Sequence, residues 1–300
     1  MKIYRSLEEL QISEPTALTI GKFEALHLGH RELLEQIKKA ASIGLKTLVI
    51  RLKSETQKDR SLLLTDEEAE KKLEEFGIEY LAELTMDQTF LNLSAESFLK
   101  DVLVDKCSMK AIFCGSDFCF GKGRAGDVTL LKANEEAYGY KAYVYQKRAV
   151  GEKTVSSTGI KEDILAGEIE RAEEALGYAY SFTGEVIHGR HLASWLGFPT
   201  ANMIPDPQKI LPPFGVYAAE VIIDGYMHMG MANLGVKPTI TDEKTVLLET
   251  NVFDFSGDLY GKTITVFLKQ YVRPEQSFPS VDALKKQMGM DSDVVRNFFF

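Results

Sequence analysis

The sequence predicts an α/β domain followed by a small antiparallel β-barrel domain. In the first half of the 300-residue chain, apolar strand-like runs alternate with segments of helical spacing, which is typical of a parallel sheet covered by helices. After residue 182, short β-type segments follow one another between turn residues without a long helix, and this indicates an antiparallel sheet that closes into a barrel. We therefore expect domains at 1–182 and 183–300.

Apolar spacing and helix-terminal residues justify the elements of the first half. Apolar residues recur at helical spacing over 30–41. Thr65 stands three residues before Glu68 as a capping box, and Gly77 marks the end of that helix. The other expected elements are strands at 17–20, 47–50, 111–114 and 141–145, a helix from about residue 94, a helix near 127–138, and two short helices within 160–180.

The second half should consist of strands until its last helix. Strands are expected within 185–189, 215–223, 226–235, 245–253 and 263–271, and residues 281–299 return to helix. Residues 233–239, which read NLGVKPT, are expected to form a turn.

Composition excludes several classes of protein. Hydrophobic residues make up 45% of the chain, and no run approaches the ~18 apolar residues of a membrane span. The net charge of −9 disfavours a nucleic-acid partner but allows a small anionic ligand. The first residues contain no signal-peptide core, and Cys107, Cys114 and Cys119 are an odd number without zinc spacing. We expect a cytoplasmic protein with small-molecule partners, no membrane partner and an open oligomeric state.

A pair of histidines follows the first strand, in GKFEALHLGH at 21–30. His27 and His30 are three residues apart, so they share one face at the start of a helix, whose N–H groups and dipole attract phosphate. Gly29 between them lets the backbone come close. Two imidazoles there can bind ATP phosphates and stabilise charge that moves to pyrophosphate. The alternative is a pair of histidines partly buried at a helix start.

Two further segments have the character of phosphate-binding loops. GSDFCFGKGRAGD at 115–127 is rich in glycine, carries Lys122 and Arg124, and could equally be a solvated turn. VSSTGIK at 155–161 places three hydroxyls at a helix start, where they can cap the helix or hold phosphates.

The second half contains LGFPTANM at 196–203 and a carboxylate within an apolar strand. Thr200 and Asn202 offer hard oxygen ligands on one side of the chain, which suits magnesium carried with ATP. Glu249 is a candidate general base for a hydroxyl nucleophile, or else a solvent-facing strand residue. Trp195 is expected in the core, with stacking on a ring as the alternative.

These segments resemble the bacterial bifunctional riboflavin kinase/FMN adenylyltransferase family. The first half resembles its HxGH nucleotidyltransferase domain of Rossmann-like fold, and the second half, through GFPTAN, MANLGVKPT, LLETNVFDFSGDLYGK and VRPEQSF, resembles its kinase barrel with C-terminal helices. The resemblance implies phosphorylation of riboflavin to FMN and adenylylation of FMN to FAD, with ATP, flavin and magnesium as substrates and cofactor.

The resemblance also implies the roles of individual residues. Glu249, His27 and His30 are the implied catalytic residues, and Thr200 and Asn202 the implied magnesium ligands. The implied ATP-binding residues are Gly21, Phe23, His27, Gly29, His30, Ser156, Ser157, Thr158, Lys161 and Gly189. The implied flavin-binding residues are Asp117, Phe118, Arg124 and Arg273.

The sequence departs from the family at several places. RLKSETQ at 51–57 replaces a Pro-His-Pro stretch of the family's flavin site, and Lys161 replaces an arginine. Ala193, Ser194 and Trp195 end a loop that is glycine- and arginine-containing in the family. The departure at 51–57 predicts weak FMN binding. An enzyme with one activity, or a flavin-binding regulatory protein without turnover, remain the alternative functions.

Overall fold

We analysed a computed structural model of the chain, which describes residues 1–55, 62–146, 148–150, 153–188, 200–238 and 244–299. The chain divides into two compact units, Met1–Ser157 and Thr158–Phe300. No helix within the described residues is long and apolar enough to cross a membrane. Each unit is considered by itself below.

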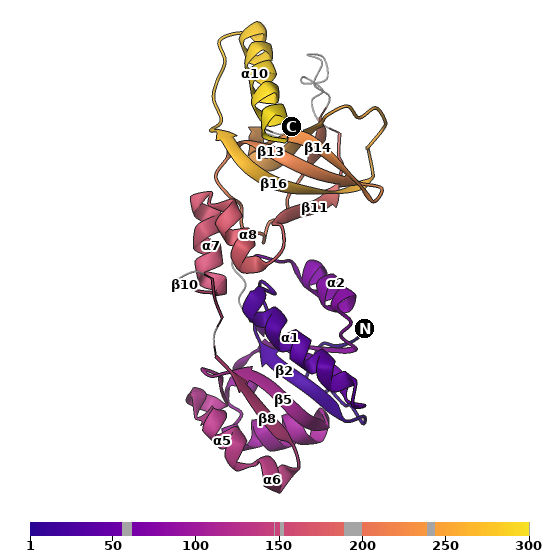
Figure 1. The fold of residues 1–300 in the computed structure, drawn as a ribbon, viewed down its shortest axis with the longest axis vertical. Coiled ribbons are helices and arrows are strands. Elements are labelled where there is room, and N and C mark those ends of the chain that lie inside the picture. Colours follow the sequence, from indigo (N-terminus) through magenta and orange to yellow (C-terminus); the bar gives the residue numbers. More distant parts are fainter. Residues whose placement is uncertain (56–61, 147, 151–152, 189–199, 239–243, 300) are drawn as a thin grey trace. The chain divides into compact units, whose positions relative to one another are not determined.

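The first unit is built on a six-stranded sheet in which every pair of neighbours is parallel, with the order β1-β4-β3-β2-β5-β8 (Figure 1). Its strands are β1 (Lys2–Tyr4), β2 (Thr16–Gly21), β3 (Lys46–Ser54), β4 (Tyr80–Met86), β5 (Met109–Gly115) and β8 (Lys141–Tyr145). The four predicted strands are confirmed, whereas β1 and β4 were not predicted. Glu83 interrupts the apolar run of β4, and it is buried there because it pairs with Arg51 of β3 at 2.8 Å.

The helices of the first unit begin at the residues that the sequence marks. His27 caps α1 (Leu28–Ala41), which contacts β2, β3 and β5. The capping box of Thr65 and Glu68 is confirmed at the start of α2 (Asp66–Phe76), and Gly77 ends that helix with φ 91°. The helix predicted from residue 94 is α4 (Ala95–Ser97), which continues as the π-type helix η1 (Phe98–Lys106).

Shorter elements complete this unit. The helix predicted near 127–138 is divided into α5 (Val128–Ala133) and α6 (Glu135–Tyr138). The others are α3 (Gln88–Leu91), β6 (Cys119–Phe120), η2 (Lys122–Arg124), β7 (Gly126–Asp127), β9 (Ala149–Val150) and β10 (Lys153–Thr154).

The strand order places a switch point beside β2. From β2 the chain moves to β3 and then β4 on one side, and it returns to β5 and then β8 on the other. In such sheets ligands bind outside the carboxyl ends of the strands at the point where the order reverses. The segment after β2 carries His27 and His30, and the segment after β5 carries Asp117 and Phe118, so the topology brings both predicted segments to one edge.

The second unit begins with two helices, α7 (Ser157–Ala166) and α8 (Ile169–Leu176), as predicted for 160–180. Apart from Ser157, both helices belong to this unit, and α8 buries Ile169, Ala172 and Leu176 and contacts β16. The change to strands comes at Ser181, the first residue of β11. The two helices therefore precede the barrel strands within the same compact unit.

The strands form an antiparallel sheet with the order β11-β16-β13-β14-β15-β12, and α10 (Val281–Phe299) contacts β13, β14 and β16 (Figure 1). Its strands are β11 (Ser181–Glu185), β12 (Ala201–Met203), β13 (Gly215–Ile223), β14 (Tyr226–Pro238), β15 (Lys244–Val252) and β16 (Thr263–Arg273).

A bridge between Ile187 and Asn202 links the chain after β11 to β12, with the N–H of Ile187 donating to the Asn202 carbonyl at 2.8 Å. Because β11 and β12 are the two ends of the strand order, this bridge closes the sheet, and the predicted barrel is confirmed. The expected turn at 233–239 is wrong for its described part, because Asn233–Pro238 continue β14 and pair with β15.

Candidate active sites

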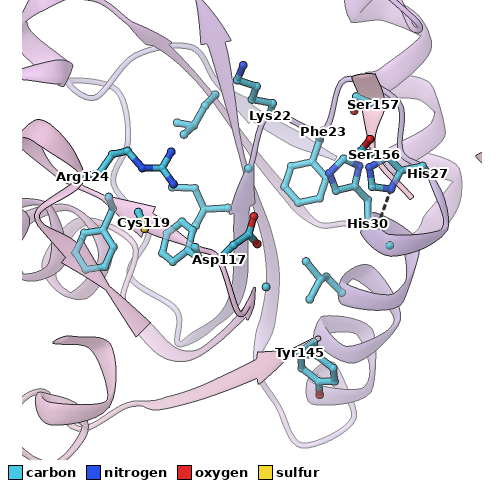
Figure 2. A pocket seen from close by; sticks show the side chains of 18 of the residues that line it. Lys22, Phe23, His27, His30, Asp117, Cys119, Arg124, Tyr145, Ser156 and Ser157 are labelled. Carbon is cyan, nitrogen blue, oxygen red and sulfur yellow. Dashed lines mark hydrogen bonds between the residues drawn. The ribbon is translucent and has the colours of Figure 1, made fainter. Parts of the chain in front are cut away.

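The turn between β2 and α1 holds the two histidines in a strained, buried backbone. Phe23 and Leu26 have φ 46° and 45°, a left-handed region that costs free energy for residues other than glycine, and both side chains are buried. The Nδ1 atom of His27 accepts a hydrogen bond from the N–H of His30 at 3.3 Å, which caps α1 (Figure 2). An added Cβ at Gly29 would lie 3.3 Å from the His27 ring, so this glycine makes room for the imidazole.

The two imidazoles stack on each other and are kept neutral. Their ring centroids are 3.7 Å apart with an angle of 9° between the planes, and Phe23 packs against His30 at 4.6 Å. Burial lowers the pKa of His27 to about 4. Burial also lowers the pKa of His30 well below its ordinary value, with repulsion from His27 as the lesser cause. Both rings are therefore neutral hydrogen-bonding groups at pH 7.

The predicted residues of the first unit line one cavity of about 620 Å³ (Figure 2). This volume is within the range of small-molecule sites. The structure brings together in its wall Gly21, Phe23, His27, Gly29, His30, Asp117, Phe118, Arg124, Ser156 and Ser157. Thr158 and Lys161 lie in α7 within the second unit and are not part of this cavity wall.

One part of the cavity wall is aromatic. Phe118 stacks on Phe120 at 5.4 Å, and Phe98, the first residue of η1, packs against Phe120 at 5.8 Å. Gly121 allows this packing, because an added Cβ would lie 2.6 Å from the backbone of Ala95. A flat apolar wall of this kind suits a planar ring system.

Cations line the same cavity. Arg124 has φ 60°, and in Figure 2 it lies on the opposite side of the view from the two histidines, with Asp117 between them. Lys22 and Arg148 also line the cavity, and among the described residues no ion pair engages their side chains or that of Arg124. Cations in a cavity of this kind favour a ligand with several negative charges.

The described part of RLKSETQ lies in β3 and the residue that follows it. Arg51 donates to Glu83 at 2.8 Å and to Asp66 at 2.9 Å, and Lys53 pairs with Asp66 and Glu83. Leu52 points the other way, as alternation along a strand requires, and lines the cavity. The charged residues therefore hold α2 against the sheet, and the residue of this segment that lines the cavity is apolar.

In the second unit, strand register places Glu249 between two asparagines. On β15, Glu249 is directly opposite Asn202 of β12 on one side and opposite Asn233 of β14 on the other. Opposite residues project from the same face of a sheet, with Cβ atoms about 4.5–5.5 Å apart. The row Asn202–Glu249–Asn233 therefore shares one face. Asn233 was not among the predicted site residues, because its place opposite Glu249 depends on the register of β14 with β15.

The predicted magnesium ligands lie at the end of this row. Asn202 is buried, and its Nδ2 donates to the Thr200 carbonyl at 3.4 Å, which fixes the amide. A threonine hydroxyl, an amide oxygen and the neighbouring carboxylate are the hard donors that Mg²⁺ prefers, so these residues fit the ion. Gly189 and the loop through Trp195 lie outside the described residues.

The side chain of Arg273 donates hydrogen bonds to α10 and to the residue that follows it in the sequence. Its Nε and Nη2 donate to the buried carboxylate of Asp291 at 2.9 and 2.6 Å, and its Nη1 donates to the Pro274 carbonyl at 2.9 Å. The guanidinium also lies 5.7 Å from the centroid of the Phe278 ring. A flavin-binding role of Arg273 stays a prediction.

Comparison with known proteins agrees with this division into two sites. A family model described as FAD synthetase matches residues 9–159, and one described as riboflavin kinase matches residues 176–299. A bifunctional riboflavin kinase/FMN adenylyltransferase of Escherichia coli K12 is 34% identical, over 100% of this chain and 98% of its own length. The chain belongs to the bifunctional riboflavin kinase/FMN adenylyltransferase family. It is therefore an enzyme with a domain for each reaction.

Other relatives extend the match across both units. The bifunctional enzyme of Haemophilus influenzae is 33% identical over 100% of this chain and 99% of its own length. A crystal structure described as a macrolide-efflux protein from Streptococcus pneumoniae has a TM-score of 0.85 at 28% identity, covering 98% of this chain and 99% of that chain. The match to FAD synthetase contains the whole cavity around His27, and the match to riboflavin kinase contains the row around Glu249.

Proposed function

We propose that the first unit transfers AMP from ATP to FMN in the cavity that His27 and His30 line, giving FAD and pyrophosphate. The observation that carries this proposal is the stacked, buried pair of imidazoles at the amino-terminus of α1, in a cavity whose wall is aromatic elsewhere. The helix terminus suits the triphosphate of ATP, and the phenylalanines suit the flavin ring.

In this transfer a phosphate oxygen of FMN attacks the α-phosphorus of ATP, and the bond to the β-phosphate breaks. The electron pair of that bond leaves with pyrophosphate. The N–H groups of the neutral imidazoles and of the first turn of α1 donate to the phosphate oxygens, while Lys22, Arg124 and Arg148 balance their charge. Positioning and electrostatics supply the catalysis, and no side chain forms a covalent bond.

For the second unit, we propose that Glu249 takes the proton of the riboflavin 5′-hydroxyl as that oxygen attacks the γ-phosphorus of ATP. The products are FMN and ADP. The support is the placement of one carboxylate between two amides on a barrel face. The Thr200 hydroxyl and the Asn202 amide would hold Mg²⁺, which supplies charge neutralisation of the phosphates when bound.

One incubation with riboflavin, ATP and magnesium tests both proposals, with FMN and FAD separated by chromatography. Glu249→Gln should abolish FMN formation, because it removes the proton acceptor, at a cost of about 10²–10⁴ in rate. His27→Ala should lose FAD formation and keep FMN formation. Each variant is the control for the other, since its intact unit should work normally when its own substrate is supplied.

The outcomes separate the alternatives. One product from the wild-type chain would indicate a single retained activity, and tight flavin binding without either product would indicate a regulatory protein. We also propose that the enzyme acts in the cytoplasm, because both reactions consume ATP and because Cys107, Cys114 and Cys119 are free thiols.

A further inference from the structure

A second carboxylate reaches the face that carries Glu249. The segment after β16 brings Glu275 over β14, where its Oε1 accepts a hydrogen bond of 3.4 Å from the Nδ2 of Asn233. Asn233 is the residue directly opposite Glu249. The amide of Asn233 therefore lies between two carboxylates that are 26 residues apart in the sequence, as counted from 249 to 275.

A glycine provides the space that Glu275 occupies. Gly235 lies two residues beyond Asn233 on β14 and so faces the same side of the sheet. A Cβ added to Gly235 would overlap the Glu275 carboxyl, whose three atoms are its nearest neighbours. The backbone of Gly235 has no left-handed φ, so its lack of a side chain, and not its conformational freedom, is what this position uses.

Hydrogen bonds to α10 hold the residues that precede Glu275. Arg273 binds the buried Asp291 through two nitrogens and the Pro274 carbonyl through a third. Asp291 also accepts from Gln287 at 2.8 Å. These bonds hold Arg273 and Pro274, the two residues that precede Glu275, and thereby set where the chain presents the exposed Glu275 side chain to Asn233.

From these contacts we propose that Glu275 is a positioning residue of the kinase site, which fixes the amide of Asn233 beside Glu249. The inference rests on the proposed role of Glu249. An amide held by Glu275 limits the positions open to the neighbouring carboxylate and to the hydroxyl that it deprotonates. Small displacements of a catalytic group lower the rate of the chemical step, since alignment is required most strictly in the transition state.

The test is a double-mutant cycle on Glu275 and Gly235, read as the kinetics of FMN formation. Glu275→Ala should lower kcat about tenfold, with KM for riboflavin and for ATP within about twofold of wild type. Gly235→Ala should produce a similar loss, because its methyl group displaces the carboxyl. In the double variant the two losses should not add, since Gly235→Ala has nothing left to displace. Glu275→Gln should keep most of the activity, because its carbonyl accepts the same hydrogen bond.

Gly289→Ala is the matched glycine control, because no atom lies within 4 Å of its added Cβ, and it should leave FMN formation unchanged. Circular dichroism and thermal unfolding establish that each variant is folded, and FAD formation from supplied FMN shows that the first unit is intact. Additive losses, full activity of Glu275→Ala, or a raised riboflavin KM at normal kcat would each overturn the positioning role. Normal kinase activity of Glu249→Gln would instead overturn the proposed function.

Discussion

Acidification should destabilise the first unit through His27. Burial holds the pKa of this imidazole at about 4 in the folded chain, against 6.5 for an unburied histidine. Between these values the unfolded chain binds a proton that the folded chain does not. The free energy of unfolding therefore falls as the pH drops below about 6.5, and the loss is complete below about 4.

The size of this effect follows from the difference of the two pKa values. A difference of about 2.5 units corresponds to about 3 kcal/mol when the pH is below both values, at 1.36 kcal/mol for each unit. At pH 5 the unfolded histidine is almost fully charged and the folded one is not. The free energy of unfolding therefore falls by about 2 kcal/mol between pH 7 and pH 5 because of His27. His30, whose pKa is also lowered by burial, adds to the loss in the same direction.

The variant that isolates the contribution of His27 to the pH dependence of stability is His27→Asn. Asparagine is a good N-cap residue, so it can accept from the His30 N–H as His27 does, but it does not titrate. Urea unfolding of the full chain at pH 7 and pH 5, followed by hydrogen exchange in β2 and α1, measures the stability of the first unit. Wild type should lose about 2 kcal/mol more than the variant. Carboxylates such as Asp66 and Glu79 contribute equally to both chains.

Equal losses in the two chains would refute this account of His27. They would mean that the ring is solvated or charged in the folded protein. A smaller loss in wild type than in His27→Asn would mean that the imidazolium is stabilised there, which is the opposite sign.

Three other predictions follow from the structure. Leu52→Ala should raise KM for FMN in FAD formation, because Leu52 lines the cavity. Lys53→Ala should lower the free energy of unfolding and leave that KM unchanged, because Lys53 pairs with Asp66 and does not line the cavity. Steady-state kinetics and urea unfolding distinguish the two effects. A fragment of residues 158–300 should be more stable than one of 183–300, which lacks the buried residues of α8 and Tyr180; thermal unfolding of both tests this, and equal stability would contradict it. A thiol reagent should modify Cys119 first, because burial raises the pKa of Cys107 to about 12 and of Cys114 to about 11. FMN should protect Cys119, because this residue lines the cavity. Mass spectrometry identifies the modified residue.

Local sequence signals predicted the elements that local physics determines. The capping box at Thr65 and Glu68 and the stop at Gly77 each satisfy backbone groups within a few residues. Strand β4 was missed because its buried charge, Glu83, is stabilised by Arg51 from another strand. No pattern within residues 80–86 contains that information.

The sites were predicted to the extent that their residues lie in recognisable segments. His27 and His30 are in one motif, and the cavity around them was found in the expected place. Phe98 and Arg148 were missed because the fold brings them to the cavity from separate segments, whereas Lys22 lies within the motif but was not among the predicted site residues. Asn233 was missed for a related reason: its place beside Glu249 is a matter of strand register, and register depends on the pairing of β14 with β15.

If the cavity around His27 and His30 is the adenylyltransferase site, as proposed, the burial of these histidines implies that two kinds of group bind the phosphates there. Because their pKa values are lowered by burial, the imidazoles supply directional N–H donors that do not change charge near pH 7. In the proposed transfer, Lys22, Arg124, Arg148 and the helix terminus would then supply the positive charge for the polyphosphate. A stacked pair of imidazolium rings at 3.7 Å would repel each other, whereas a neutral pair can pack closely and hold a fixed geometry. Neutrality is thus the condition that allows two histidines to occupy the start of one helix and still face the same ligand.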